Sequence, residues 1–177
     1  MSHTLQNALE SGQEARIVQI DFSAAFDMVN YQGILYKLCP VVIGGSVLSI
    51  LTQLKSNRSN HVMVDGCWSK LVNVLLGMPQ GSVFGQLLFL RYTSELFSIL
   101  ENKLIGNADD SSLIAVVPFP GVRVTVAESL SRDLVKVSEW CNLWWMKLNA
   151  SKTKTMIISR PCTTHPQSPA LLLAELC

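Results

Sequence analysis

Apolar positions recur along the chain with two different spacings, which predict interleaved strands and helices. A nearly continuous apolar run over residues 16–20 is typical of a buried central strand, and it ends on the carboxylate of Asp21. Between residues 122 and 148, apolar side chains return every three or four positions, which predicts a long amphipathic helix. Two apolar runs within residues 104–117 flank Ala-Asp-Asp-Ser, and they predict a hairpin with a tight acidic turn.

Local capping and turn signals predict shorter elements elsewhere. They comprise a helix over residues 4–9, a helix over residues 31–38 capped by Asn30, a helix over residues 46–54, a hairpin over residues 61–75 that turns at Asp65-Gly66, a helix over residues 82–100 and a strand over residues 155–159. The alternation of strands, hairpins and helices predicts an α+β domain, with a largely antiparallel sheet and helices packed on one face. In such a sheet, the strand end at Asp21 can lie beside the tip of the acidic hairpin.

Composition adds two constraints. Hydrophobic residues make up 49% of the 177 residues and charged residues only 15%, so the chain is more apolar than most soluble domains. This suggests surfaces that are normally covered. The formal net charge is only +1, which counts against a nucleic-acid-binding protein because such proteins are usually basic.

The five cysteines are scattered, and neither they nor the three histidines have metal-ligand spacing. The sequence therefore favours reduced cysteines over a zinc site or a disulfide framework. The first residues lack the basic and then apolar pattern of a signal peptide. We accordingly expect an intracellular protein of the cytoplasm and/or nucleus, not a secreted one.

Residues 71–90 carry no charge and are long enough to span a bilayer. Asn73, Pro79, Gln80 and Gln86 interrupt this run, however, and Met-Pro-Gln-Gly has the composition of a loop. We therefore interpret the segment as a strand, a loop and a helix, and we expect no membrane span.

The acidic hairpin has a chemical and a structural interpretation. Two adjacent carboxylates at a turn repel each other unless a cation lies between them, although Asp and Ser are also good turn formers. The strand end at Asp21 supplies a second acidic site. Together Asp21, Asp109 and Asp110 could hold two Mg²⁺ ions about 3.5–4 Å apart, an arrangement that serves phosphoryl transfer.

Four segments resemble the palm motifs of reverse transcriptases, in the same order along the chain. The first is Asp21-Phe22-Ser23-Ala24-Ala25-Phe26-Asp27, the second is Gly-Met-Pro-Gln-Gly-Ser-Val-Phe-Gly at residues 77–85, the third is Ala108-Asp109-Asp110, and the fourth is Leu-Asn-Ala-Ser-Lys-Thr-Lys at residues 148–154. Their order and spacing are similar to those of the non-LTR (LINE-type) retrotransposon enzymes. The resemblance extends over residues 18–159.

This resemblance implies a polymerase-palm-like fold and RNA-directed DNA polymerase activity. It assigns Asp21, Asp109 and Asp110 to two Mg²⁺ ions, for which Mn²⁺ could substitute. One ion would lower the pKa of the primer 3′-hydroxyl, and the other would neutralise the departing pyrophosphate. The implied partners are an RNA template, a DNA primer and dNTPs, with no membrane.

The resemblance also implies five positions along the nucleotide and template: Phe22, Phe26, Gln80, Gly81 and Asn107. Phe26 would pack under the sugar and exclude a ribose 2′-hydroxyl, and a side chain at Gly81 would collide with a base. The structural alternatives are a core aromatic at Phe26 and an ordinary Pro/Gly loop around Gln80. Asn107 departs from the family pattern, which usually has Tyr or Phe there to support the primer end.

Several other residues have a plain structural interpretation beside the chemical one. By resemblance, Lys152 or Lys154 would place a proton or a positive charge on the pyrophosphate. The alternative is a pair of solvated lysines before a strand. Trp140, Trp144 and Trp145 have helical spacing, which favours a buried helix face over a base-stacking platform.

We expect the family's fingers and thumb to lie outside this chain. Residues 1–159 would form a partial reverse transcriptase palm region, and residues 160–177 a loose tail. The isolated chain would then be weakly active or inactive. The alternative is a decayed, non-catalytic remnant that acts at most as a nucleic-acid or protein binding module.

Overall fold

The computed structural model describes residues 2–39, 45, 49, 53, 59–74, 76–78, 83–107 and 110–160. The chain divides into two compact units. The first unit comprises residues 1–23 and 93–177, and the second comprises residues 24–92. The two acidic segments singled out in the sequence both belong to the first unit.

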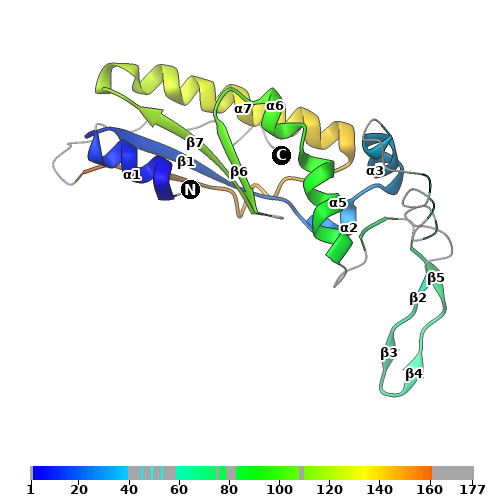
Figure 1. Ribbon diagram of the computed structural model, residues 1–177. Coiled ribbons are helices and arrows are strands. Elements are labelled where there is room, and N and C mark those ends of the chain that lie inside the picture. The colour runs from blue at the N-terminus through cyan, green and yellow to red at the C-terminus, as the bar shows by residue number, and fades with distance from the viewer. Residues whose placement is uncertain are drawn as a thin grey trace. The chain divides into compact units, whose positions relative to one another are not determined.

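The first unit is built on a four-stranded sheet with the strand order β6-β7-β1-β8 (Figure 1). The strands are β6 (Lys103–Asn107), β7 (Asp110–Val117), β1 (Glu14–Asp21) and β8 (Lys154–Ile158). All neighbouring strands are antiparallel. The two central strands, β1 and β7, are buried over most of their length, as their apolar runs predict.

Helices complete the first unit. The long α7 (Arg123–Trp144) packs on β7, while α1 (Ser2–Glu10) packs on β1 (Figure 1). The short α6 (Leu96–Ile99) and the 3₁₀ helix η1 (Pro120–Val122) flank the β6–β7 hairpin. The buried face of α7 consists mainly of Ala127, Leu130, Leu134, Val137, Trp140 and Cys141. This mixture of helices and antiparallel sheet confirms the predicted α+β class.

The long helix ends earlier than its apolar pattern predicts. Trp145 adopts a left-handed conformation with φ 60°, and the N–H of Met146 donates to the carbonyl of Cys141. These features form a left-handed helix cap. Trp145 is therefore 64% exposed, whereas Trp140 is buried, so the prediction of one buried tryptophan face is wrong at Trp145.

The second unit contains short helices and two small hairpin sheets. The helices are α2 (Ala25–Met28), α3 (Tyr31–Leu38) and most of α5 (Val83–Thr93), and the sheets pair β2 (Ser59–Asn60) with β5 (Val72–Asn73) and β3 (Met63–Val64) with β4 (Cys67–Trp68). Asn30 caps α3, since its Oδ1 accepts from the N–H of Gln32 at 2.8 Å. Asp65 and Gly66 both have positive φ, as a type I′ turn requires. Both sequence predictions are confirmed.

The single helix predicted over residues 82–100 is wrong. The structure contains α5 and α6 instead, and they are separated at Ser94 and Glu95. There the N–H of Phe97 donates to the carbonyl of Ser94, three residues back, which breaks the four-residue ladder of an α-helix.

Some predictions fall outside the described residues: most of the helix over residues 46–54, the loop at residues 79–82 and the tail from residue 161 onward. In the part of the chain that the structure describes, no helix combines the length and apolarity needed to cross a bilayer.

Candidate active site

Asp21 and Asp110 lie directly opposite each other on neighbouring strands of the first unit. Asp21 is the last residue of β1, Asp110 is the first residue of β7, and the antiparallel register pairs the two. Residues in such a pair have Cβ atoms about 4.5–5.5 Å apart. Asp110 is exposed and Asp21 is partly exposed. The strand end at Asp21 therefore does lie beside the first residue after the predicted acidic turn, as expected.

The two carboxylates share the more accessible face of the sheet at this end. Side chains alternate between faces along a strand, so Asp21 lies on the same face as Gln19, which is exposed. Ile20 lies on the opposite face and is 1% exposed. The apolar residues of β1 thus build the core, while Gln19 and Asp21, near its C-terminal end, are accessible to solvent.

The carboxylates fit a divalent cation. Like charges directly opposite each other on two strands are unfavourable, and a cation between them removes that repulsion. Carboxylate oxygens are the ligands that Mg²⁺ and Mn²⁺ prefer. Asp109 lies outside the described residues, and among those described no group of three or more His, Cys, Asp or Glu side chains could hold a metal ion. The described part of the chain therefore contains two of the three predicted ligands.

The fourth motif is hydrogen-bonded to the end of β1. The N–H of Asn149 donates to the carbonyl of Asp21 at 2.9 Å, and the N–H of Ser23 donates to the carbonyl of Lys147 at 2.8 Å. The N–H of Lys152 in turn donates to the carbonyl of Asn149 at 3.1 Å, and the Lys152 side chain is exposed. Residues separated by more than 120 positions in the sequence are thus joined through the backbone.

A cavity of about 580 Å³ adjoins this loop, and no sequence pattern predicted it. Its lining includes Ser23, Cys141, Met146, Lys147, Asn149 and Ser151. Burial raises the pKa of the Cys141 thiol to about 12, so the thiol stays protonated near neutral pH. Cys141 therefore contributes to the cavity as a neutral, apolar wall.

The predicted nucleotide-binding residues are divided between the two units. Phe22, in the first unit, is buried and forms a bridge with Leu148. Phe26, in the second unit, is partly exposed, and its ring centroid lies 4.9 Å from that of Phe89. Gln80 and Gly81 lie outside the described residues, while the backbone of Asn107 pairs with that of Asp110.

The start of the second motif is hydrogen-bonded to the segment that carries Phe26. The N–H of Met78 donates to the carbonyl of Phe26 at 2.8 Å, and the N–H of Gly77 donates to the carbonyl of Val29 at 3.0 Å. Gly77 has φ +87°, and a Cβ there would lie 3.0 Å from the carbonyl oxygen of Asp27. Glycine is therefore required where the two motifs meet.

Comparison with known proteins gives a consistent result. Residues 1–169 match the family model described as "Reverse transcriptase (RNA-dependent DNA polymerase)". The chain is 29% identical over 152 residues to the RNA-directed DNA polymerase from mobile element jockey of Drosophila funebris, and 31% identical over 156 residues to that of Drosophila melanogaster. Each alignment covers 82% of this chain and 16% of the relative. The chain thus spans about a sixth of the length of these relatives.

Solved structures with the same fold include two telomerases. Apo telomerase from Candida tropicalis, truncated from the C-terminal domain, superposes with a TM-score of 0.64 and 14% identity, over 91% of this chain and 35% of that chain. Telomerase from Candida albicans, in complex with a TWJ fragment of telomeric RNA, gives a TM-score of 0.61 and 15% identity, over 93% of this chain and 30% of that chain. At such identities the similarity establishes the fold.

Proposed function

Because the chain belongs to the reverse transcriptase family, of the type found in non-LTR retrotransposons, we propose that it supplies the catalytic palm of an RNA-directed DNA polymerase. The register that pairs Asp21 with Asp110 carries this proposal. It brings together two acidic residues that lie 89 positions apart in the sequence, at the ends of two strands that are otherwise mostly buried.

Asp21, Asp109 and Asp110 would hold two Mg²⁺ ions, for which Mn²⁺ could substitute. The family is dependent on divalent metals, and the paired carboxylates offer the hard oxygen ligands that these ions need. When bound, the ions would acidify a primer 3′-hydroxyl and offset the charge on the departing pyrophosphate. The protein's part is to hold the carboxylates in register.

The other predicted side chains would orient the substrates and place a positive charge near the pyrophosphate. Lys152, on the loop that is hydrogen-bonded to the Asp21 segment, would direct its ammonium toward the pyrophosphate. Phe22, Phe26, Gln80 and Gly81 would contact the nucleotide and the template. The family binds nucleic acid, and we propose an RNA template, a DNA primer and dNTPs as partners, within the cytoplasm or the nucleus.

Asn107 favours a second candidate function, that of a non-catalytic binding remnant. It occupies the position where the family usually has an aromatic residue, and its backbone pairs with that of Asp110. An amide cannot support the primer end as an aromatic ring would. On this alternative, the three carboxylates could be replaced without loss of any binding function.

Mn²⁺ binding, followed by water proton relaxation, tests the proposal. The parent chain should bind Mn²⁺, and the Asp109→Ala/Asp110→Ala variant should not. Asp65→Asn is the matched control, because it removes a carboxylate from the turn of the second unit's hairpin. Equal binding by the parent and the double variant, or no binding by either, would contradict the proposal.

A further inference from the structure

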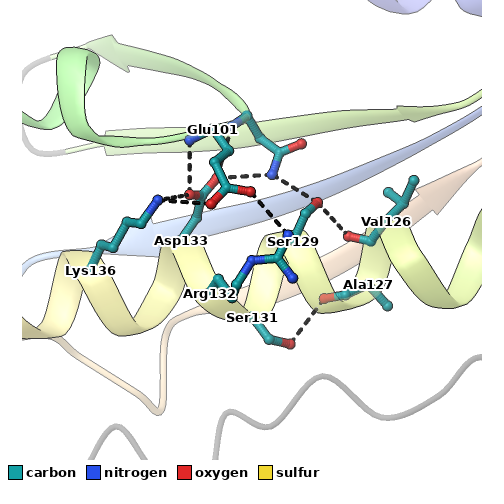
Figure 2. Close-up of polar contacts among 9 residues, drawn as sticks. Glu101, Val126, Ala127, Ser129, Ser131, Arg132, Asp133 and Lys136 are labelled. Carbon is teal, nitrogen blue, oxygen red and sulfur yellow. Dashed lines mark hydrogen bonds and ion pairs between the residues drawn. The ribbon is translucent and has the colours of Figure 1, made fainter.

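A buried carboxylate holds the segment that leads into the acidic hairpin. Asp133, in α7, is 0% exposed. Its Oδ1 accepts from the backbone N–H of Glu101 at 2.9 Å, and its Oδ2 accepts from the backbone N–H of Asn102 at 2.8 Å and from Asn102 Nδ2 at 2.9 Å. Figure 2 shows Asp133 directed from the helix toward the Glu101 segment. Both oxygens are therefore bound to the two residues that precede β6.

Basic and polar groups surround this contact (Figure 2). Lys136 Nζ lies 3.7 Å from Asp133 Oδ1, which partly balances the buried charge. Arg132 and Lys136 also bind the carboxylate of Glu101, at 3.0 and 2.9 Å. The Glu101 pairs are half-exposed, so the buried Asp133 contacts, and not the surface pairs, determine where the backbone lies.

β6 depends on such a contact because it is an edge strand. Within the residues that the structure describes, it is bonded to β7 on one side only, so no second neighbouring strand helps to specify its register. If β6 slipped along β7, the N–H groups of Glu101 and Asn102 would leave Asp133. A buried carboxylate without donors is strongly unfavourable, so the contact penalises every register except the observed one.

A second contact, near the other end of β6, specifies the same register. A Cβ placed on Gly106 would lie 3.1 Å from Phe97 Cζ and 3.6 Å from Ser111 Oγ. The Phe97 ring, from α6, therefore lies against a position without a side chain. A slip of one residue would bring Ile105 or Asn107 beneath that ring.

We propose that Asp133 is a positioning residue for the metal site. It locks the register of β6 against β7, the strand whose first residue, Asp110, lies opposite Asp21. This inference rests on the proposed metal-binding function of Asp21, Asp109 and Asp110. Asp133 itself is buried in α7 and binds backbone N–H groups, so its role is exerted through the strand.

The test compares Mn²⁺ affinity with folding in the full chain. In Asp133→Asn, an amide replaces one of the two acceptor oxygens and turns its own N–H toward a backbone donor. We expect Mn²⁺ affinity to fall about tenfold, with the circular dichroism spectrum of the parent retained. Glu101→Gln is the control: it breaks the exposed ion pairs but keeps the backbone N–H, and it should leave the affinity unchanged.

A second variant covers the case in which Asp133→Asn does not fold. Gly106→Val should weaken Mn²⁺ binding by placing a branched side chain against Phe97, and adding Phe97→Ala should restore the affinity. Affinity is compared only between variants that retain the circular dichroism spectrum of the parent, because relief of the clash would also restore stability.

The outcomes separate the two proposals. No Mn²⁺ binding by the parent would refute the metal site itself. Binding by the parent together with unchanged affinity in Asp133→Asn would overturn the positioning role while leaving the metal site intact. If Asp133→Asn is unfolded, unchanged affinity in Gly106→Val, or a loss that Phe97→Ala fails to restore, would overturn it as well.

Discussion

Replacing one of the two facing carboxylates should stabilise the chain when no divalent metal is present. Asp21 and Asp110 are paired in register, so their carboxylates lie roughly 5–6 Å apart, given the Cβ spacing of a cross-strand pair. Coulomb's law at this distance gives about 0.7 kcal/mol of repulsion in water and about 3 kcal/mol at an effective dielectric constant of 20. Because Asp110 is exposed, the value near water applies. Asp110→Asn should therefore raise the free energy of unfolding by about 0.5–1 kcal/mol.

Divalent metal should make the parent more stable than Asp110→Asn. A ligand that binds only the folded state at ten times its Kd stabilises that state by about 1.4 kcal/mol. The parent should gain this amount from Mg²⁺ or Mn²⁺, whereas Asp110→Asn, which lacks a ligand, should gain less. The parent would then be more stable than Asp110→Asn when Mg²⁺ or Mn²⁺ is present, and less stable than Asp110→Asn in EDTA.

Urea unfolding measures both effects. Of the four tryptophans, only Trp68 lies in the second unit, so fluorescence in a Trp68→Phe background reports on the first unit. In about 1 M NaCl the Debye length is about 3 Å, and the advantage of Asp110→Asn in EDTA should shrink. Asp65→Asn, matched in chemistry, should show neither effect. If Asp110→Asn is less stable than the parent in low-salt EDTA, the reasoning from paired charges is wrong.

Three further predictions concern other parts of the chain. Gly77→Ala should destabilise the second unit by about 1–3 kcal/mol in urea unfolding, because of its φ of +87° and the close carbonyl of Asp27; an unchanged midpoint would contradict this. Hydrogen bonds from its two basic partners lower the pKa of Glu101 from 4.5 to about 2. The resulting stabilisation is complete above the unfolded pKa and disappears as the pH falls through about 2, so Glu101→Gln should unfold with a weaker pH dependence between pH 5 and 2; a dependence equal to the parent's would refute the assignment. Cys141 should resist alkylation at pH 8, as measured by mass spectrometry, while the exposed Cys67 reacts. Equal labelling of the two thiols would contradict the burial of Cys141.

Much of the first unit could be predicted from the sequence because its signals are local. The apolar run of β1, the two arms of the acidic hairpin and the periodicity of α7 each specify an element within one segment. The facing of Asp21 and Asp110 follows once an antiparallel pair is assumed, since both lie at strand ends.

The remainder depends on contacts between distant segments. Asp133 occupies the buried face of α7, and its donors lie 31 and 32 residues away, so hydrophobic periodicity gives no hint of it. The break between α5 and α6 also has no strong helix breaker, because Ser94 and Glu95 are neither Gly nor Pro. These features arise where tertiary contacts override local propensity.

The carboxylates at Asp21 and Asp110 can be separated from the requirements of folding. Core pairs such as Val18 with Leu113 and Ile17 with Ile114 specify the register of β1 and β7 by packing alone. A neutral residue at either acidic position would therefore preserve the fold and relieve the repulsion. The fold gains nothing from two facing carboxylates in the absence of a cation, whereas a divalent ion needs both of them. Metal affinity, measured apart from stability, is therefore the property that distinguishes the proposed metal-binding palm from a remnant.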